Sequence, residues 1–253
     1  MGNHVVITSR SQRSVQKTIE DIKSEPSDLN IDRSSCKKDG MVLDIDDQNS
    51  YSDETTEFDV LFCLPGFCIA KYFKDLEITE FQSQINTNLL GVVRMLMYYR
   101  KNNTKPFTFV AANSTTAGFS FPGYSCYSAS KSVLDSFHES VHMQLSREKI
   151  DFKLLNCGTM KTNGLRNENK CKPRFTIDFE YNNTVSNTDE VAKYYINLFR
   201  DRKRLSYDWF TYFVTIRSNC EKRIDYLLFP LSVFVLFTAK CLVEIKFRKA
   251  RID

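Results

Sequence analysis

The chain has 253 residues, of which 42% are hydrophobic and 26% are charged, values that suit a globular protein and exclude a disordered or fibrous one. Its 35 basic and 31 acidic residues leave a formal charge of +4, too small a surplus for the surface of a nucleic-acid-binding protein. The eight cysteines form no Cys-x-x-Cys pair, so we expect free thiols in a cytosol-facing protein rather than disulfides or a zinc site.

Strand and helix patterns alternate along the first 155 residues. A polar stretch over 24–40, with Pro26, predicts a loop. The run 58–64 is apolar apart from Asp59, as expected for a parallel strand that is covered by helices on both faces. Alternating strands and helices predict right-handed βαβ units and a doubly wound, Rossmann-like parallel sheet. The predicted strands are 4–8, 41–43, 58–64, 107–112 and 152–155, and the predicted helices are 11–23, 77–100 and about 126–147.

The composition changes after residue 204, where an aromatic patch precedes an apolar segment. Leu227–Ala239 carries no charge, and the wider segment 226–243 approaches the roughly 20 residues that cross a bilayer. Four basic residues follow at 246–251, a flank expected on the cytosolic side. We therefore predict a membrane-associated segment over 205–253. A buried core helix is the alternative.

The strongest chemical signal is the run Tyr127-Ser128-Ala129-Ser130-Lys131. Side chains four residues apart lie on one face of a helix, so the Lys131 ammonium is expected to lower the pKa of the Tyr127 phenol towards the working range. Such a phenol exchanges a proton with a carbonyl or alcohol oxygen. Ser114 lies thirteen residues upstream, after a predicted strand, where its hydroxyl could bind the same oxygen.

With these residues the chain resembles the short-chain dehydrogenase/reductase family over residues 3 to about 200. The resemblance implies that Ser114, Tyr127 and Lys131 are catalytic. It also implies that Asn88, in the segment Asn88-Leu89-Leu90-Gly91, holds a water molecule in the proton relay. We accordingly expect residues 1–204 to form a domain of this family.

The same resemblance implies a nicotinamide cofactor. Asp44 matches the residue beside the adenine, and Thr162 matches the threonine that binds the nicotinamide carboxamide. Gly66 is the glycine retained in the turn after the 58–64 strand, and Tyr127 and Lys131 would also contact the cofactor. Arg10 ends a predicted strand with no acidic neighbour, which favours NADPH because arginine binds the 2′-phosphate.

Three further features resemble family members that reduce keto sphingoid bases. They are the segment 73–77 with Phe81, the pairs Glu168-Asn169 and Lys172-Pro173, and the apolar C-terminal segment with its basic end. They imply reduction of 3-oxosphinganine to sphinganine by NADPH, on the cytosolic face of the endoplasmic reticulum membrane. The oligomeric state stays open, with a homo-oligomer as one alternative. Another membrane-bound lipid or steroid dehydrogenase of the same family is the alternative.

One departure from the family concerns its opening strand and glycine-rich TGxxxGxG turn, which cradle the pyrophosphate. In this sequence Met1-Gly2-Asn3 corresponds to residues just before the second family strand. We expect the neighbours of the first strand to lose a hydrogen-bonding partner, and the polypeptide as written to have little or no NADPH affinity. Either the sequence is an incomplete version of a working reductase, or it is a shortened, non-catalytic paralogue that acts as a binding protein.

A competing motif is His138-Glu139-Ser140-Val141-His142, which matches the HExxH zinc signature. A third ligand is not evident, because His4 is the only other histidine. We therefore predict no metal site, with both histidines on a partly exposed helix face.

Overall fold

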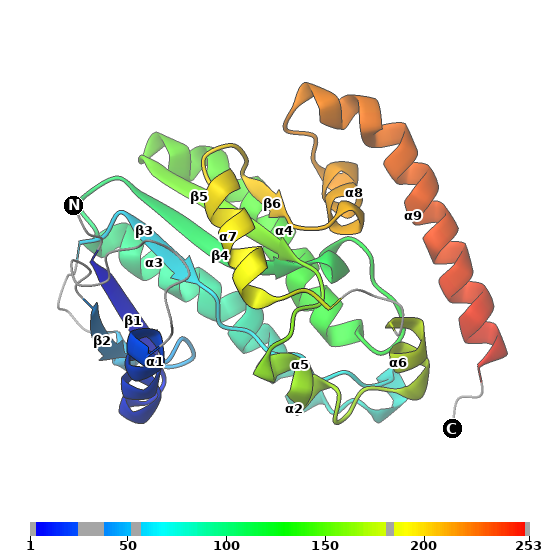
Figure 1. The fold of residues 1–253 in the computed structure, drawn as a ribbon, viewed down its shortest axis with the longest axis horizontal. Coiled ribbons are helices and arrows are strands. Elements are labelled where there is room, and N and C mark those ends of the chain that lie inside the picture. The colour runs from blue at the N-terminus through cyan, green and yellow to red at the C-terminus, as the bar shows by residue number, and fades with distance from the viewer. Residues whose placement is uncertain (1–3, 25–37, 52–56, 181–184, 251–253) are drawn as a thin grey trace. The chain divides into compact units, whose positions relative to one another are not determined.

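A computed structural model describes residues 4–24, 38–51, 57–180 and 185–250. The chain divides into two compact units, Met1–Thr55 and Thr56–Asp253, which are drawn in Figure 1 and described separately below. Cys36 and most of the loop predicted over 24–40 lie outside the described residues.

The first unit is a strand–helix–strand unit made of β1 (Val5–Ser9), α1 (Gln12–Ser24) and β2 (Lys38–Val42). β1 and β2 pair in parallel, with Val5 opposite Lys38. The strand predicted at 41–43 in fact begins three residues earlier and includes Gly40, which the sequence pattern assigned to a loop. A Cβ atom at Gly40 would lie 2.2 Å from Val15 Cγ1, so the glycine allows α1 to pack closely on the strand.

The second unit contains a parallel sheet in the order β3-β4-β5-β6. Its strands are β3 (Val60–Cys63), β4 (Phe107–Ser114), β5 (Ile150–Cys157) and β6 (Arg204–Ser206). The described strands thus form two parallel sheets, which confirms the Rossmann-like α/β class. The expectation that both faces of the third strand are covered is wrong, since Val60 is 37% and Phe62 48% exposed. Both side chains lie on one face of β3, since residues two apart in a strand point the same way, so this face is only partly covered.

A continuous helical segment follows β3, close to the single helix predicted at 77–100. It comprises α2 (Ile78–Ile85), a π-helical turn (Asn86–Gly91) and α3 (Val92–Asn102), with the short 3₁₀ turn Phe73–Asp75 before it. Such π turns are rare and often mark functional positions. Here the turn contains the fully buried Asn88.

The rest of the unit supplies helices around the sheet. α4 (Ser125–Arg147) confirms the helix predicted at 126–147. The remaining helices are α5 (Asn163–Glu168), α6 (Arg174–Glu180), α7 (Thr188–Leu198), α8 (Trp209–Ser218) and α9 (Arg223–Lys249). The boundary predicted between residues 204 and 205 falls inside β6. One apolar core cluster joins β4, β5, β6 and α7 through Val110, Leu155, Leu205, Val191 and Tyr195.

α9 is a 27-residue helix that is long and apolar enough to cross a membrane. Only 17% of its most apolar window is buried, and Leu227, Phe234 and Phe237 are each more than 60% exposed. A narrow face with Leu236 and Val243 packs against the core cluster around Phe119, Phe175 and Val214. Because most of its apolar surface is exposed, α9 does not resemble the buried core helix that was the alternative prediction.

Candidate active site

Tyr127 and Lys131 lie in the first two turns of α4. The Lys131 Nζ atom is 5.9 Å from the centre of the Tyr127 ring and donates a hydrogen bond of 2.8 Å to the Ala112 carbonyl of β4. Lys131 is only 2% exposed. The structure therefore places the ammonium beside the phenol ring, at the carboxyl end of the sheet.

Ser114 is the last residue of β4 and is 8% exposed. Its Oγ atom accepts hydrogen bonds of 3.2 Å from the Thr116 backbone N–H and 3.0 Å from the Thr116 hydroxyl. Ser114 also interacts with the Tyr127 phenol through hydrogen bonding, in a sense that lowers the pKa of the phenol. The hydroxyl groups of Ser114 and Tyr127, thirteen residues apart in the sequence, therefore interact at the end of β4.

The protonation states at this site differ from those expected. Burial, followed by the nearby Cys68, raises the pKa of Tyr127 above its usual value, and the contribution of Ser114 does not reverse this. Burial also lowers the pKa of Lys131 to about 8. The prediction that Lys131 lowers the phenol pKa is thus wrong for this structure. Both groups lie in surroundings that disfavour charge, so the Tyr127 phenol is neutral.

Asn88 connects the π-helical turn to two other segments. Its Oδ1 atom accepts a 3.0 Å hydrogen bond from the Phe67 N–H, and its Nδ2 group donates to the Phe67 carbonyl at 2.9 Å and to the Ser130 Oγ atom at 3.1 Å. Ser130 precedes Lys131 on α4. These bonds hold the segment after β3 and the helix with Tyr127 in a fixed relation, a positioning role that the sequence does not reveal.

Gly66 lies where Asn88 and Lys131 meet. A Cβ atom at Gly66 would be 3.3 Å from Asn88 Oδ1 and 3.5 Å from Lys131 Nζ. A larger residue would thus fill the space beside these two polar groups. The structure therefore brings together five of the predicted site residues, and the glycine leaves room for a ligand next to them: Gly66, Asn88, Ser114, Tyr127 and Lys131.

The other predicted cofactor residues lie elsewhere. Thr162 caps α5, where its Oγ1 atom accepts a 3.1 Å hydrogen bond from the Leu165 N–H. Arg10 and Asp44 belong to the first unit. Arg10 directly follows β1, and Asp44 lies two residues after the end of β2, so both are at the carboxyl end of that strand pair. The Asp44 Oδ1 atom accepts a 3.0 Å hydrogen bond from the Asp46 N–H. The cofactor contacts of these three residues remain predictions.

A charged cluster near Tyr127 was not predicted as a site. Lys172 lies 2.6 Å from carboxylate oxygens of both Glu168 and Glu180, and the Tyr124 hydroxyl also contacts both glutamates. The Tyr124 and Tyr127 rings are 6.1 Å apart. The sequence marked Glu168 and Lys172 only as part of two pairs shared with reductases of keto sphingoid bases, whereas the fold alone reveals the contribution of Tyr124 and Glu180.

This cluster contains two carboxylates and one ammonium, and all three side chains are at most 15% exposed. Burial alone would lower the pKa of Lys172, but its bonds to Glu168 and Glu180 raise it. Burial and the two carboxylates raise the pKa of Tyr124, which is therefore neutral. Counting Lys172 against Glu168 and Glu180 leaves one uncompensated negative charge. Glu168 is near enough to Tyr127 to contribute to the raised pKa of its phenol.

The histidine motif on α4 does not form a zinc site with its neighbours in the structure. The His138 Nε2 atom is 2.9 Å from the Phe152 carbonyl. Contrary to the exposed face predicted for both histidines, His138 is fully buried, because α4 packs this face on β5. Within the described ranges, no group of three or more His, Cys, Asp or Glu side chains could hold a metal ion.

The chain is similar to known oxidoreductases. Residues 1–172 match the family model described as short chain dehydrogenase. The chain is 25% identical over 206 residues to the 3-ketodihydrosphingosine reductase of Dictyostelium discoideum, covering 75% of this chain and 62% of that protein. It is 31% identical over 108 residues to the oxidoreductase YusZ of Bacillus subtilis, covering 41% of this chain and 38% of the relative. The chain thus spans less than two thirds of each of these relatives.

Solved structures share the fold. A short chain dehydrogenase/reductase from Burkholderia phymatum in complex with NAD has a TM-score of 0.67 and 13% identity, over 84% of this chain and 83% of that one. A gluconate 5-dehydrogenase from Burkholderia cenocepacia in complex with NADP and tartrate has a TM-score of 0.64 and 15% identity, over 80% and 83%. Since the family model covers most of the sequence, the chain belongs to the short-chain dehydrogenase family.

Proposed function

We propose that this protein is an NADPH-dependent reductase that converts the ketone of 3-oxosphinganine to the alcohol of sphinganine. The observation that carries the proposal is the junction of Ser114, Tyr127 and Lys131 at the carboxyl end of β4, where a neutral phenol meets a hydroxyl and a buried lysine. Carboxyl ends of parallel strands are where α/β folds bind ligands.

The chemistry assigns each residue one task. When bound, NADPH supplies a hydride to the carbonyl carbon and leaves as NADP⁺. Tyr127 donates its phenolic proton to the carbonyl oxygen, so that hydride and proton together convert C=O to CH–OH. The Ser114 hydroxyl donates a hydrogen bond to the same oxygen, and Lys131 in its cationic form stabilises the phenolate that remains.

The space beside Gly66 fits a cofactor that approaches Asn88 and Lys131, because any side chain there would fill it. We propose that Tyr127 and Lys131 contact the nicotinamide ribose and that Thr162 binds the carboxamide. In the first unit, Asp44 would lie beside the adenine, and Arg10 would bind the 2′-phosphate and so select NADPH. The gluconate 5-dehydrogenase from Burkholderia cenocepacia, which has a similar fold, was solved in complex with NADP.

Two observations support a sphingoid-base substrate. One is the likeness to 3-ketodihydrosphingosine reductases, at 25% identity for that of Dictyostelium discoideum. The other is the uncompensated negative charge of the Glu168–Lys172–Glu180 cluster beside Tyr127. Because 3-oxosphinganine carries an ammonium group on the carbon next to its ketone, a negative cluster near the proton donor would attract and orient it.

The exposed apolar surface of α9 supports a membrane location. The long acyl chain of the substrate resides in a bilayer, and α9 has the length and hydropathy to reach it. Lys246, Arg248 and Lys249 form the last turn of α9, where basic residues favour the cytosolic side. We therefore propose the endoplasmic reticulum membrane, with the Tyr127 site facing the cytosol and α9 lying along the cytosolic surface, because a single crossing would place its basic end and the Tyr127 domain on opposite sides.

The decisive experiment supplies the full chain, in detergent micelles, with saturating NADPH and 3-oxosphinganine, and follows sphinganine by mass spectrometry. As a working reductase, the natural chain would form sphinganine and Tyr127→Phe would not. No sphinganine at any NADPH concentration would overturn the proposed function. Turnover of a steroid ketone but not of 3-oxosphinganine would instead indicate another lipid dehydrogenase.

A fluorescence titration with NADPH tests the prediction that this polypeptide alone has little or no cofactor affinity. Saturable binding in the micromolar range would refute that prediction and support the reductase. If NADPH does not bind and Tyr127→Phe leaves the cellular phenotype unchanged, the non-catalytic binding protein is the better description.

A further inference from the structure

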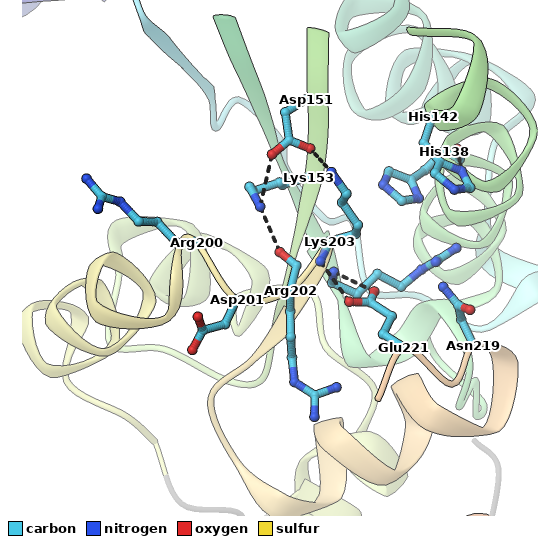
Figure 2. Close-up of a pocket in the computed structure, with 11 residues that line it drawn as sticks. His138, His142, Asp151, Lys153, Arg200, Asp201, Arg202, Lys203, Asn219 and Glu221 are labelled. Carbon is cyan, nitrogen blue, oxygen red and sulfur yellow. Dashed lines mark hydrogen bonds and ion pairs between the residues drawn. The ribbon is translucent and has the colours of Figure 1, made fainter. Parts of the chain in front are cut away.

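A second site lies at the amino end of the β3–β6 sheet, away from Tyr127. A cavity of about 370 Å³ opens there, between α4, the start of β5 and the segment that leads into β6 (Figure 2). This is several times the volume of one water molecule. Five cationic and three acidic residues line it together with two histidines and Asn219. The cavity is lined by His138, His142, Asp151, Lys153, Arg200, Asp201, Arg202, Lys203, Arg204, Asn219 and Glu221.

Arg204 is the unusual member of this lining. The side chain is 1% exposed, and its Nε group donates a 3.0 Å hydrogen bond to Asp135 Oδ1 on α4. Its Nη1 and Nη2 groups are buried and have no hydrogen-bond partner among the described residues. A buried guanidinium with two unpaired nitrogens is costly unless a polar group binds them.

His138 presents a complementary atom in the same cavity. Since a carbonyl oxygen only accepts, Nε2 must donate to Phe152, and Nδ1 is then an acceptor if the ring is neutral. Burial, with the nearby Arg204 charge, lowers the pKa of His138 to about 3, so the ring is neutral at physiological pH. Nδ1 is buried and likewise has no partner within the part of the chain that the structure describes.

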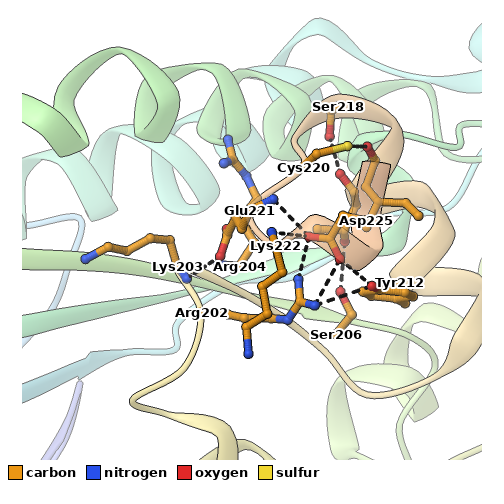
Figure 3. Close-up of polar contacts among 12 residues, drawn as sticks. Arg202, Lys203, Arg204, Ser206, Tyr212, Ser218, Cys220, Glu221, Lys222 and Asp225 are labelled. Carbon is orange, nitrogen blue, oxygen red and sulfur yellow. Dashed lines mark hydrogen bonds and ion pairs between the residues drawn. The ribbon is translucent and has the colours of Figure 1, made fainter. Parts of the chain in front are cut away.

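Three of the other four lining cations already contact a carboxylate. Lys153 and Lys203 both contact Asp151, and Arg202 binds Asp225 through two hydrogen bonds (Figure 3). Arg204 is therefore the lining residue whose buried donors lack an acceptor. Arg204 and His138 both line the cavity, and a ligand that reached their buried atoms would find two guanidinium donor groups and one imidazole acceptor.

We propose that this cavity binds a phosphate group that retains a P–OH. Its oxygens would accept hydrogen bonds from Nη1 and Nη2 of Arg204, and its hydroxyl would donate to Nδ1 of His138. Hydrogen phosphate satisfies both requirements, whereas sulfate lacks the hydroxyl. The site differs from the Tyr127 site, because the eight-residue strands β4 and β5 separate the two ends of the sheet by roughly 25 Å.

The phosphate has two sources with the same chemistry. Asn219 and Glu221 line the cavity, and α9 begins two residues after Glu221. If α9 enters a bilayer, a phosphomonoester lipid headgroup could reach Arg204. A free phosphate in solution is the other source.

The test is a ³¹P NMR titration of inorganic phosphate into the full chain in a phosphorus-free detergent, with sulfate as competitor. We expect saturable binding to one site and weak competition by sulfate. Arg204→Lys keeps the charge beside Asp135 but removes both Nη donors, and should weaken binding about tenfold or more. Asn219→Asp adds a negative charge to the lining with little change in shape, so it should also weaken binding if Arg204→Lys fails to fold. Arg174→Lys, at a side chain that is 85% exposed, is the matched control and should have no effect.

Nanodiscs separate the two sources. Loss of phosphate binding when phosphatidic acid is added to phosphatidylcholine nanodiscs would support the lipid headgroup, and unchanged binding in both would support free phosphate. If water alone satisfies Arg204, phosphate will not saturate and Arg204→Lys will behave like the natural chain, which overturns the proposal. Sulfate that displaces phosphate at equal concentration would equally overturn it, because the His138 contact would then play no part.

Discussion

Lys131 and Asp151, at opposite ends of the β3–β6 sheet, have opposite kinds of hydrogen-bond partner. At the carboxyl end, Lys131 has a backbone carbonyl as its hydrogen-bond partner, and burial lowers its pKa to about 8. At the amino end, burial would raise the pKa of Asp151, but Lys203 and Lys153 bind the carboxylate and lower it. Neutral acceptors leave a buried group close to losing its charge, whereas opposite charges hold it ionised.

This difference fits proton transfer at the carboxyl end of the sheet and anion binding at the amino end. Lys131 lies near its ionisation point and Tyr127 is a neutral phenol, so the carboxyl end suits a proton donor beside a titratable lysine. Fixed charge pairs do not titrate near neutral pH, so the amino end suits structural ion pairs and a bound anion at Arg204. The predictions below test this division, in order of decreasing effect.

Removal of the phenolic hydroxyl should have the largest effect. We expect Tyr127→Phe to lower kcat/KM by about 10³-fold or more, because the proton donor is lost while the ring remains. Steady-state kinetics, with a ketone substrate that can be raised to saturating concentration, measures this change in kcat/KM. Tyr226→Phe, at a position 67% exposed on α9, is the control that should keep full activity. A small effect of Tyr127→Phe would mean that proton transfer does not occur at the carboxyl end.

The charge pairs of the amino end should matter for stability. Asp225 is fully buried. It accepts two hydrogen bonds from Arg202, one from the Tyr212 hydroxyl, and one each from the N–H groups of Glu221 and Lys222 (Figure 3). Asp225→Asn leaves the Arg202 charge unpaired and should cost about 3–5 kcal/mol of unfolding free energy, or roughly 6–20 °C in Tm.

The matched control is Glu244→Gln on the same helix. Glu244 also pairs with an arginine, Arg248, but the two side chains are 63% and 76% exposed. Exposed pairs contribute little, so Glu244→Gln should leave the melting temperature nearly unchanged. Equal effects of the two substitutions, measured by thermal unfolding in detergent, would contradict the view that burial makes the Asp225 pair important.

The pH profile should report Lys131. Its pKa is about 8 in the folded protein, against 10.5 for an ordinary lysine, so the cationic form is present below pH 8 and disappears above it. If the cation stabilises the phenolate, kcat/KM should fall about tenfold per pH unit above that value. Lys131→Arg should remove this limb because a guanidinium does not deprotonate there. An unchanged profile in the variant would assign the titration to another group.

The smallest effect concerns substrate choice. Glu168→Gln removes one carboxylate from the cluster with Lys172 and Glu180, so the surplus negative charge beside Tyr127 is lost. We expect about a tenfold lower kcat/KM for 3-oxosphinganine and little change for the same ketone without its amino group. Glu148→Gln, in an exposed pair with Arg100, should affect neither. Equal losses with both ketones would indicate that Glu168 only holds α5 and α6 in place.

Local sequence patterns predicted most of the first 155 residues, because strands and helices there follow apolar spacing and turn residues. The predicted helix at 126–147 and strand at 107–112 agree closely with α4 and β4. Gly40 was misassigned because a glycine in a strand and a glycine in a loop look alike in sequence. The π turn at Asn88 and the short β6 were not predicted, since their hydrogen bonds depend on contacts with distant segments.

Together with the alternating strands and helices, the spacing of Ser114, Tyr127 and Lys131 was enough to indicate the family, because a helix fixes which side chains are neighbours four residues apart. Only the tertiary structure decided the ionisation of these groups, which depends on burial and on partners such as Ala112 and Cys68 from other segments. It also brought Tyr124 to Glu180, and Arg204 and His138 to one cavity. Local spacing determines faces of helices and strands, whereas desolvation and charge pairing depend on what the folded chain packs against each face.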